Sequence, residues 1–83
     1  MTDSLFVSVC KQEVVEYVMQ HTGERITEDD VRVVWLCKAL NNNKALLSTN
    51  RGDGMYYEMT YNGQHGELYV DAYQKVNNYT VVV

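Results

Sequence analysis

The sequence predicts an α+β fold in which one N-terminal helix covers one face of a four-stranded antiparallel meander. Before Gly23, apolar residues recur at three- and four-residue spacing, which is the period of a helix. After Asp30, β-branched and aromatic residues alternate with polar ones, and turns rich in Asn and Gly separate the runs. Such short turns make consecutive strands antiparallel neighbours. With 83 residues and no proline, the chain 1–83 has room for a single domain.

The helix is expected over residues 4–22. Ser4 or Asp3 can cap its N-terminus, and Gly23 stands where a helix usually ends in the left-handed conformation. An apolar stripe that faces the core runs along the helix and comprises Phe6, Val7, Cys10, Val14, Tyr17 and Val18. Val15 and Met19 fall outside this stripe and form a second, smaller apolar patch, which is either incidental or a contact with another chain.

Strands are expected over residues 31–40, 44–49, 55–62 and 67–70. Before the first strand, Thr27 and Asp30 have the spacing of a capping box, which favours one helical turn. Two interpretations of residues 71–78 remain open. A short helix is favoured because Ala, Gln and Lys prefer that state, and the alternative is a continued strand that turns at Asn77–Asn78 and returns as a hairpin.

Strict alternation along the first strand predicts which side chains share a face. Val33, Trp35 and Cys37 then point one way, whereas Val34 and Leu36 point the other. With Leu46 of the second strand, Val34 and Leu36 would form a second apolar surface that one helix can hardly cover. This surface is a candidate interface, for a homodimer or for another partner, unless the tail segment folds over it.

The charge balance excludes several classes of protein. Seven basic and eleven acidic residues give a net charge of −4, which disfavours binding to duplex nucleic acid. The apolar runs are far shorter than the ~18–20 residues that cross a bilayer, and the first ten residues carry Asp3 instead of the Lys or Arg of a secretory signal. Cys10 and Cys37 are too few for a disulfide scaffold, so both are expected to be reduced and buried in a cytoplasmic protein.

The sequence predicts no catalytic, cofactor or metal site. His21 lies near a helix C-terminus, where a cation interacts with the dipole, and His65 lies in a glycine-containing turn. No nucleophile, base and orienting acid are spaced as hydrolytic chemistry requires. The acidic run from Glu28 to Asp30 lacks the spaced ligands and the glycine of a calcium loop.

Two groups of residues are candidate contacts instead. A tyrosine-rich side of the sheet with nearby cations is the candidate binding face, and it comprises Tyr56, Tyr69, Tyr73, Lys44, Arg51 and Lys75. Sheet aromatics stack on nucleotides or anchor protein partners, and so few cations suit a small nucleotide or a protein better than a long nucleic acid. The second group is acidic and could mimic phosphates towards a partner; it comprises Glu24, Glu28, Asp29 and Asp30.

From Asp29 to Lys75 the chain resembles a known family. The runs DDVRVVWLCKALNNNKALLST, DGMYYEMTYNG and ELYVDAYQK are similar to those of a small family of uncharacterised proteins encoded by bacteriophages and prophages. Arg32 stands where that family commonly has an aromatic residue, and Gln64–Gly66 and Tyr79–Val83 depart from its pattern. The resemblance implies a phage or prophage source and the cytoplasm of an infected or lysogenic bacterium, and it implies no activity.

Two functional hypotheses follow. The first is a non-enzymatic phage accessory protein that binds a host or phage protein, as an inhibitor in host takeover or counter-defence. The second is a homo-oligomer that binds or sequesters a small ligand such as a nucleotide, between subunits or over the tyrosine face.

Overall fold

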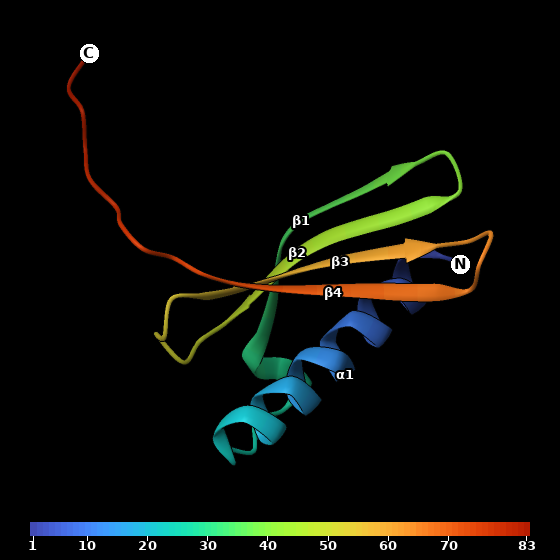
Figure 1. The fold of residues 1–83 in the computed structure, drawn as a ribbon, viewed down its shortest axis with the longest axis horizontal. Helices are drawn as coiled ribbons and strands as arrows, with labels where there is room; N and C mark the ends of the chain where they lie inside the picture. Colours follow the sequence, from blue (N-terminus) through green and yellow to red (C-terminus); the bar gives the residue numbers. More distant parts are fainter.

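One long helix is followed by four strands, in the order that the sequence predicts. The structure is a computed structural model and describes residues 1–83 (Figure 1). The elements are α1 (Asp3–Thr22), the 3-10 helix η1 (Glu28–Asp30), β1 (Val31–Ala39), β2 (Asn42–Thr49), β3 (Met55–Asn62) and β4 (Glu67–Gln74). The strands form one sheet in the order β1-β2-β3-β4, and every neighbouring pair is antiparallel. The predicted α+β class and meander are therefore confirmed.

Both ends of α1 are fixed by capping contacts. The helix begins one residue earlier than expected, because the Thr2 hydroxyl accepts a hydrogen bond from the Leu5 N–H at 3.2 Å and caps the helix in place of Asp3 or Ser4. Gly23 ends the helix as predicted. It adopts the left-handed conformation with φ of 77°, and its N–H donates to the Met19 carbonyl at 2.9 Å.

The connection from α1 to β1 is closed by the predicted capping box. The Thr27 N–H donates to Asp30 Oδ2 at 2.9 Å, and the Asp30 N–H donates to the Thr27 carbonyl at 3.0 Å. These bonds close the single turn of η1. Ile26, just before this turn, is buried and adds to the core.

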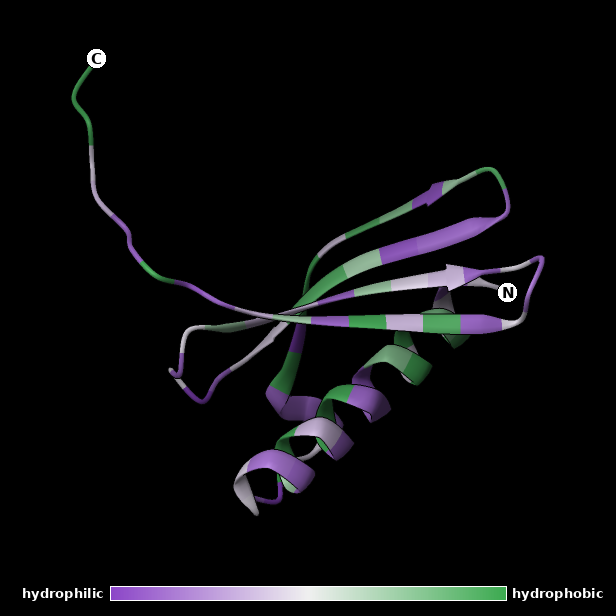
Figure 2. Cartoon of the chain, in the orientation of Figure 1, coloured by the Kyte–Doolittle hydropathy of each residue, from purple (hydrophilic) through white to green (hydrophobic).

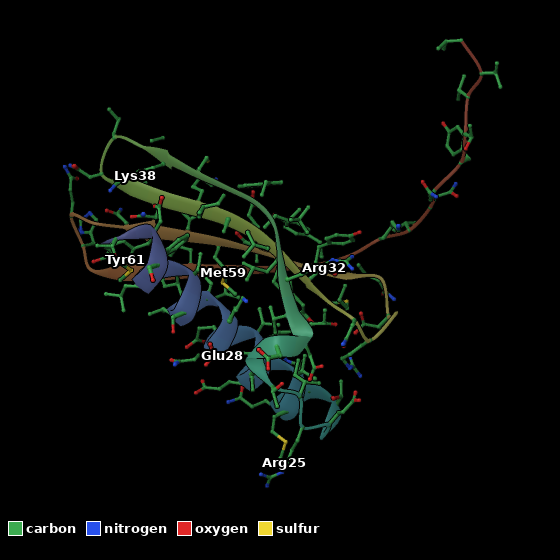
Figure 3. All side chains as sticks on the ribbon, turned by 180° about the vertical axis from the view of Figure 1, so that it is seen from behind. Arg25, Glu28, Arg32, Lys38, Met59 and Tyr61 are labelled. Carbon is green, nitrogen blue, oxygen red and sulfur yellow. The ribbon has the colours of Figure 1, made fainter.

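The core lies between α1 and one face of the sheet. Every fourth residue of the helix packs against that face, so Phe6, Cys10, Val14 and Val18 are almost completely buried. On the sheet side the buried apolar residues are Val31, Ala45, Leu47, Tyr57 and Met59. Figure 3 shows Met59 between the helix and the sheet. The helix packs on β1, β2 and β3, and β4 lies at the far edge.

A β-bulge in β1 exchanges the two faces of that strand. Val33 opposes Leu47, but the next paired residue, Trp35, opposes Leu46, so Val34 is the additional residue. Beyond the bulge, Trp35 and Cys37 share the face of Leu46. The prediction that Val33, Trp35 and Cys37 lie on one face is therefore wrong, because strict alternation does not hold across a bulge.

The first hairpin turn also differs from the expectation. Its two turn residues are Leu40 and Asn41, because Ala39 already pairs with Asn42. Leu40 adopts a φ of 55°, which is uncommon for a residue other than glycine, and its side chain is exposed. Gly63 of the β3–β4 turn lies so close that a Cβ there would be 2.7 Å from the Asn41 carbonyl oxygen. The two turns at this end of the sheet thus pack directly on each other.

The favoured tail helix over residues 71–78 is wrong. β4 continues to Gln74, which pairs with Met55, and the Lys75 N–H donates to the Gly54 carbonyl at 2.7 Å. Pairing along the whole length of β3 outweighs the weak helix propensity of this short segment. The alternative is correct in continuing the strand, but no strand returns. Residues 76–83, called the C-terminal arm below, leave the sheet in an extended conformation without a turn at Asn77–Asn78 (Figure 1).

Adjacent leucines on opposite faces of β2 test this packing. Leu47 is fully buried under α1, so Leu47→Ala is expected to lower the free energy of unfolding by about 2–5 kcal/mol. Leu46 lies on the other face and is only partly buried, so Leu46→Ala is expected to cost less than half as much. Urea unfolding of the two variants at low protein concentration measures the difference. Equal losses would contradict a helix that covers only one face.

Candidate functional site

The face of the sheet opposite α1 is not covered by any helix or strand (Figure 1). Cross-strand pairing arranges its side chains in four rows. These rows are Arg32, Ser48, Tyr56 and Tyr73; Trp35, Leu46, Glu58 and Asp71; Cys37, Lys44, Thr60 and Tyr69; and Ala39, Asn42, Asn62 and Glu67. We call this surface the open face.

Large aromatic side chains dominate the open face. Trp35 is 40% exposed, Tyr69 43% and Tyr73 52%, although all three belong to regular strands. Trp35 lies on β1 beside Leu46 of β2. Tyr69 and Tyr73 lie on β4, and Tyr73 pairs with Tyr56 of β3. Exposed Trp and Tyr residues on a rigid support are typical anchors of protein interfaces.

The charges on the open face balance one another. Lys44 Nζ lies 3.9 Å from Glu58 Oε2, and the Tyr73 hydroxyl donates to Glu58 Oε1 at 3.4 Å. The carboxylates of Asp71 and Glu58 raise the pKa of Tyr73, so its phenol stays protonated and neutral. Arg32 and Lys75 add two further cations and Glu67 one further carboxylate, so the face has three of each.

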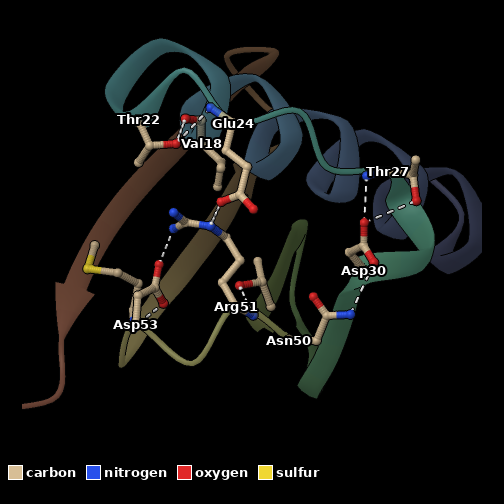
Figure 4. Close-up of polar contacts among 10 residues, drawn as sticks. Val18, Thr22, Glu24, Thr27, Asp30, Asn50, Arg51 and Asp53 are labelled. Atoms are coloured by element: carbon tan, nitrogen blue, oxygen red, sulfur yellow. Dashed lines mark hydrogen bonds and ion pairs between the residues drawn. The ribbon is translucent and has the colours of Figure 1, made fainter.

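The structure brings together most of the predicted binding face, but not all of it. Tyr56, Tyr69, Tyr73 and Lys44 share the open face. Arg51 does not join them. Its guanidinium Nε lies 2.5 Å from Glu24 Oε2 and its Nη1 pairs with Asp53, so this side chain links the β2–β3 turn to the residues that follow α1 (Figure 4).

Lys75 lies at one end of the open face, beside a small hollow of about 260 Å³. The hollow is lined by residues from the start of β1, from the β2–β3 turn and from the end of the sheet: Arg32, Ser48, Thr49, Gly52, Asp53, Gly54, Tyr56 and Lys75. Two cations and one aromatic ring thus border one concave surface. This combination suits a phosphate attached to a planar group.

The predicted acidic contact is divided by the fold. Glu24 pairs with Arg51, and Asp30 accepts hydrogen bonds from the Thr27 N–H and from Asn50 Nδ2 at 3.0 Å (Figure 4). Glu28 and Asp29 are exposed and make no such contact. Two of the four carboxylates therefore hold the connection against the β2–β3 turn.

The predicted interface of Val34, Leu36 and Leu46 does not form one surface. Leu46 lies on the open face, Leu36 opposes Ala45 on the side of α1, and Val34 is the bulge residue. Sequence reasoning missed Trp35 and Cys37 on the open face. The signal that could have found them is the unbroken apolar run Val33–Cys37, which strict alternation cannot explain in a half-covered strand.

The two cysteines occupy opposite environments. Cys10 is buried in the core, and this burial, with the nearby Glu13 carboxylate, raises the pKa of its thiol to about 12. Cys37 is exposed on β1, so the expectation that both are buried is wrong for this residue. The bulge is the cause, because it turns Cys37 away from α1.

Other features of the surface are modest. Val15 and Met19 line a shallow hollow beside α1 together with Glu16, Gln20, Arg25 and Ile26. Val15 also packs against the core, so the expectation that it lies outside the core-facing stripe is wrong for this residue. The amide nitrogen of Asn43 is buried without a hydrogen-bond partner.

No three His, Cys, Asp or Glu side chains gather in a group that could hold a metal ion. Neither helix combines the length and apolar character that crossing a membrane requires.

Comparison with known proteins assigns the chain to a family. A model of the family of unknown function DUF6275 matches residues 7–83. The protein belongs to DUF6275. No curated protein and no solved structure matches the chain. The matched part of this DUF6275 protein includes all four strands and continues through the C-terminal arm.

The hydrogen bonds of Asp30 predict a dependence of stability on pH. The Thr27 N–H and the Asn50 amide lower the pKa of Asp30, so the carboxylate stabilises the fold above its unfolded pKa. This contribution begins to be lost as the pH falls below about 4, the pKa of Asp in the unfolded chain. It is lost completely once the pH has fallen through the lowered pKa of the folded state. Asp30→Asn is expected to lower the melting temperature at pH 7 and to flatten its decline in acid. Asp29→Asn, the matched control, should change neither, and equal behaviour of the two variants in thermal scans would contradict the assignment.

Proposed function

We propose that this DUF6275 protein acts by binding another protein through the open face, and that it performs no catalysis. The observation that supports this proposal is the set of exposed aromatic side chains, Trp35, Tyr69 and Tyr73, on a sheet face without a covering element. A small chain that leaves such residues uncovered loses part of its own hydrophobic stabilisation, and contact with a partner recovers it.

The charge of the open face favours a protein over a nucleic acid. Lys44 is already paired with Glu58, and Asp71 lies in the same row as Glu58. A phosphate backbone would meet two carboxylates and little unpaired positive charge, which gives weak binding. A protein surface with apolar residues and one or two basic side chains matches Trp35, the tyrosines and these carboxylates.

The proposed setting is a bacterial cell that carries a phage or prophage. The resemblance of the sequence to phage and prophage proteins supports this source, and it supports a role as an accessory protein that inhibits a host protein in takeover or counter-defence. Binding in the cytoplasm of the infected or lysogenic cell is part of the proposal. The acidic segment adds at most Glu28 and Asp29 to the contact, since Glu24 and Asp30 are engaged within the fold.

Substitution of Trp35 tests the proposal, with its neighbour as control. Trp35 and Leu36 are 40% and 38% exposed but lie on opposite sides of the sheet. For a partner captured from host-cell extract and then purified, Trp35→Ala is expected to weaken binding about 30-fold, the effect of losing an aromatic anchor. Leu36→Ala should change the affinity less than threefold. Titration calorimetry with both variants measures this, and equal affinities of wild type and Trp35→Ala would refute the open face as the contact.

A second candidate function is the binding of a small nucleotide, by this chain or by a homo-oligomer of it. The hollow beside Lys75 favours it, because Arg32 and Lys75 border the same concave surface as Tyr56. Asp53 at the same hollow is paired with Arg51, so the two cations can match the charge of a mononucleotide phosphate. The tyrosine ring offers a stacking surface.

Thermal shift assays with mononucleotides test this second function. Wild type is expected to melt at a temperature that rises with nucleotide concentration, as ligand linkage requires. Lys75→Gln should lose most of this rise, because it removes one of the two cations at the hollow. Lys38→Gln, at the other end of β1 (Figure 3), should keep it. A melting temperature that no nucleotide changes would exclude this function.

A further inference from the structure

The C-terminal arm exposes apolar side chains that find no contact within the chain. Val76 is 97% exposed, Tyr79 77% and Val82 93%. The last five residues, Tyr79–Val83, are all aromatic or β-branched and uncharged, which is the composition of a strand. Figure 2 shows the end of the arm as hydrophobic. The arm therefore has the sequence of a strand and no neighbour to pair with.

The outer edge of β1 is the complementary feature. β1 pairs only with β2, so the N–H and C=O groups along its other side have no partner strand. Its middle, Val33–Cys37, is uncharged over five residues, and Val34, Trp35 and Leu36 there are exposed. A long apolar edge of this kind pairs with any available strand unless something covers it.

The other edge of the sheet is less suitable. β4 carries Glu67 and Asp71 among its eight residues, and an apolar arm beside them would remove water from two carboxylates. The uncharged run of five residues in β1 matches the uncharged Tyr79–Val83 in length and character. The comparison favours β1 over β4 as the edge that the arm joins.

We propose that residues 76–83 of one copy add as a further strand to the outer edge of β1 in a second copy. Main-chain hydrogen bonds to β1 provide the pairing, and the valines of the arm cover apolar side chains of Val33–Cys37. Reciprocal exchange of two arms closes a dimer. Tyr69 and Tyr73 lie on β4, at the opposite edge of the sheet, and stay uncovered. The exchange is argued from the arm and the edge of β1 alone, so this inference does not depend on the proposed function.

The geometry favours a second copy over the arm's own chain. β1 and β4 are at opposite edges of the sheet, and the arm leaves in line with β4 (Figure 1). To pair with the outer edge of its own β1, the arm would have to turn and cross about four strand spacings, roughly 19 Å, which uses about six residues. Too few residues would remain to pair with Val33–Cys37, whereas the β1 edge of a second copy can approach the extended arm directly.

Disulfide trapping tests the exchange with a native reporter. Cys37 is exposed on β1, and Cys10 is buried with a pKa of about 12, so it does not compete. Single cysteines replace Thr80, Val81 and Val82 in turn, and Gln12→Cys on the exposed side of α1 is the control. Mild oxidation of the arm variants is expected to give a covalent dimer at one or two of the three positions, in at least tenfold higher yield than the control.

Each outcome decides the proposal. A disulfide within one chain, seen as an oxidised monomer on a non-reducing gel, would show that the arm folds on its own sheet and would overturn it. Dimer yields equal to that of Gln12→Cys would overturn it as random collision. Light scattering at about 100 µM should give twice the mass of one chain for residues 1–83 and a single mass for residues 1–75. A monomeric full chain, or a truncated chain that keeps the doubled mass and the native circular dichroism, would also refute the exchange.

Discussion

The packing of α1 against one face of the sheet is the constraint on which the other features depend. A helix that buries Phe6, Cys10, Val14 and Val18 against three strands leaves the opposite face in water, because the chain has no second long helix. Antiparallel sheets tolerate this arrangement when the outer face is polar. Here the outer face holds Trp35, Tyr69 and Tyr73 among its polar residues. The fold is therefore complete on one side of the sheet and offers a contact surface on the other.

The bulge in β1 decides what that surface contains. If Val34 were paired regularly instead of forming a bulge, strict alternation would place Trp35 and Cys37 under α1, and Leu36 would face water. The bulge reverses this arrangement after Val33, so the large indole ring joins Leu46 on the open face. A single bulge in an edge strand thus turns the only tryptophan of the chain from the core side to the exposed side.

Local signals in the sequence predict the helix, the capping box and the strand order well, because each depends on neighbouring residues. Gly23 ends α1 through its left-handed conformation, and Thr27 with Asp30 closes η1 through contacts within four residues. The wrong predictions concern features that depend on contacts between residues far apart in the sequence. β4 extends to Gln74 because β3 is there to pair with it, and Arg51 turns from the tyrosines because Glu24, far away in sequence, lies within reach. A candidate site assembled from several strands is sensitive to each such error. Of the predicted set, Tyr56, Tyr69, Tyr73 and Lys44 share one face and Lys75 lies at its end, whereas Arg51 lies apart.

The contacts of Glu24 and Asp30 are the reason that the proposed protein contact lies on the sheet and not on the acidic residues between Glu24 and Asp30. Glu24 reaches Arg51, and Asp30 reaches Asn50, so two carboxylates join the connection before β1 to the β2–β3 turn. Carboxylates engaged in this way keep the end of α1 in place and cannot also present themselves as phosphate mimics. No helix or strand of the chain covers the open face, and no strand pairs with the outer edge of β1. The two surfaces share Trp35, whereas Tyr69 and Tyr73 lie at the opposite edge of the sheet and stay exposed when a second copy joins β1.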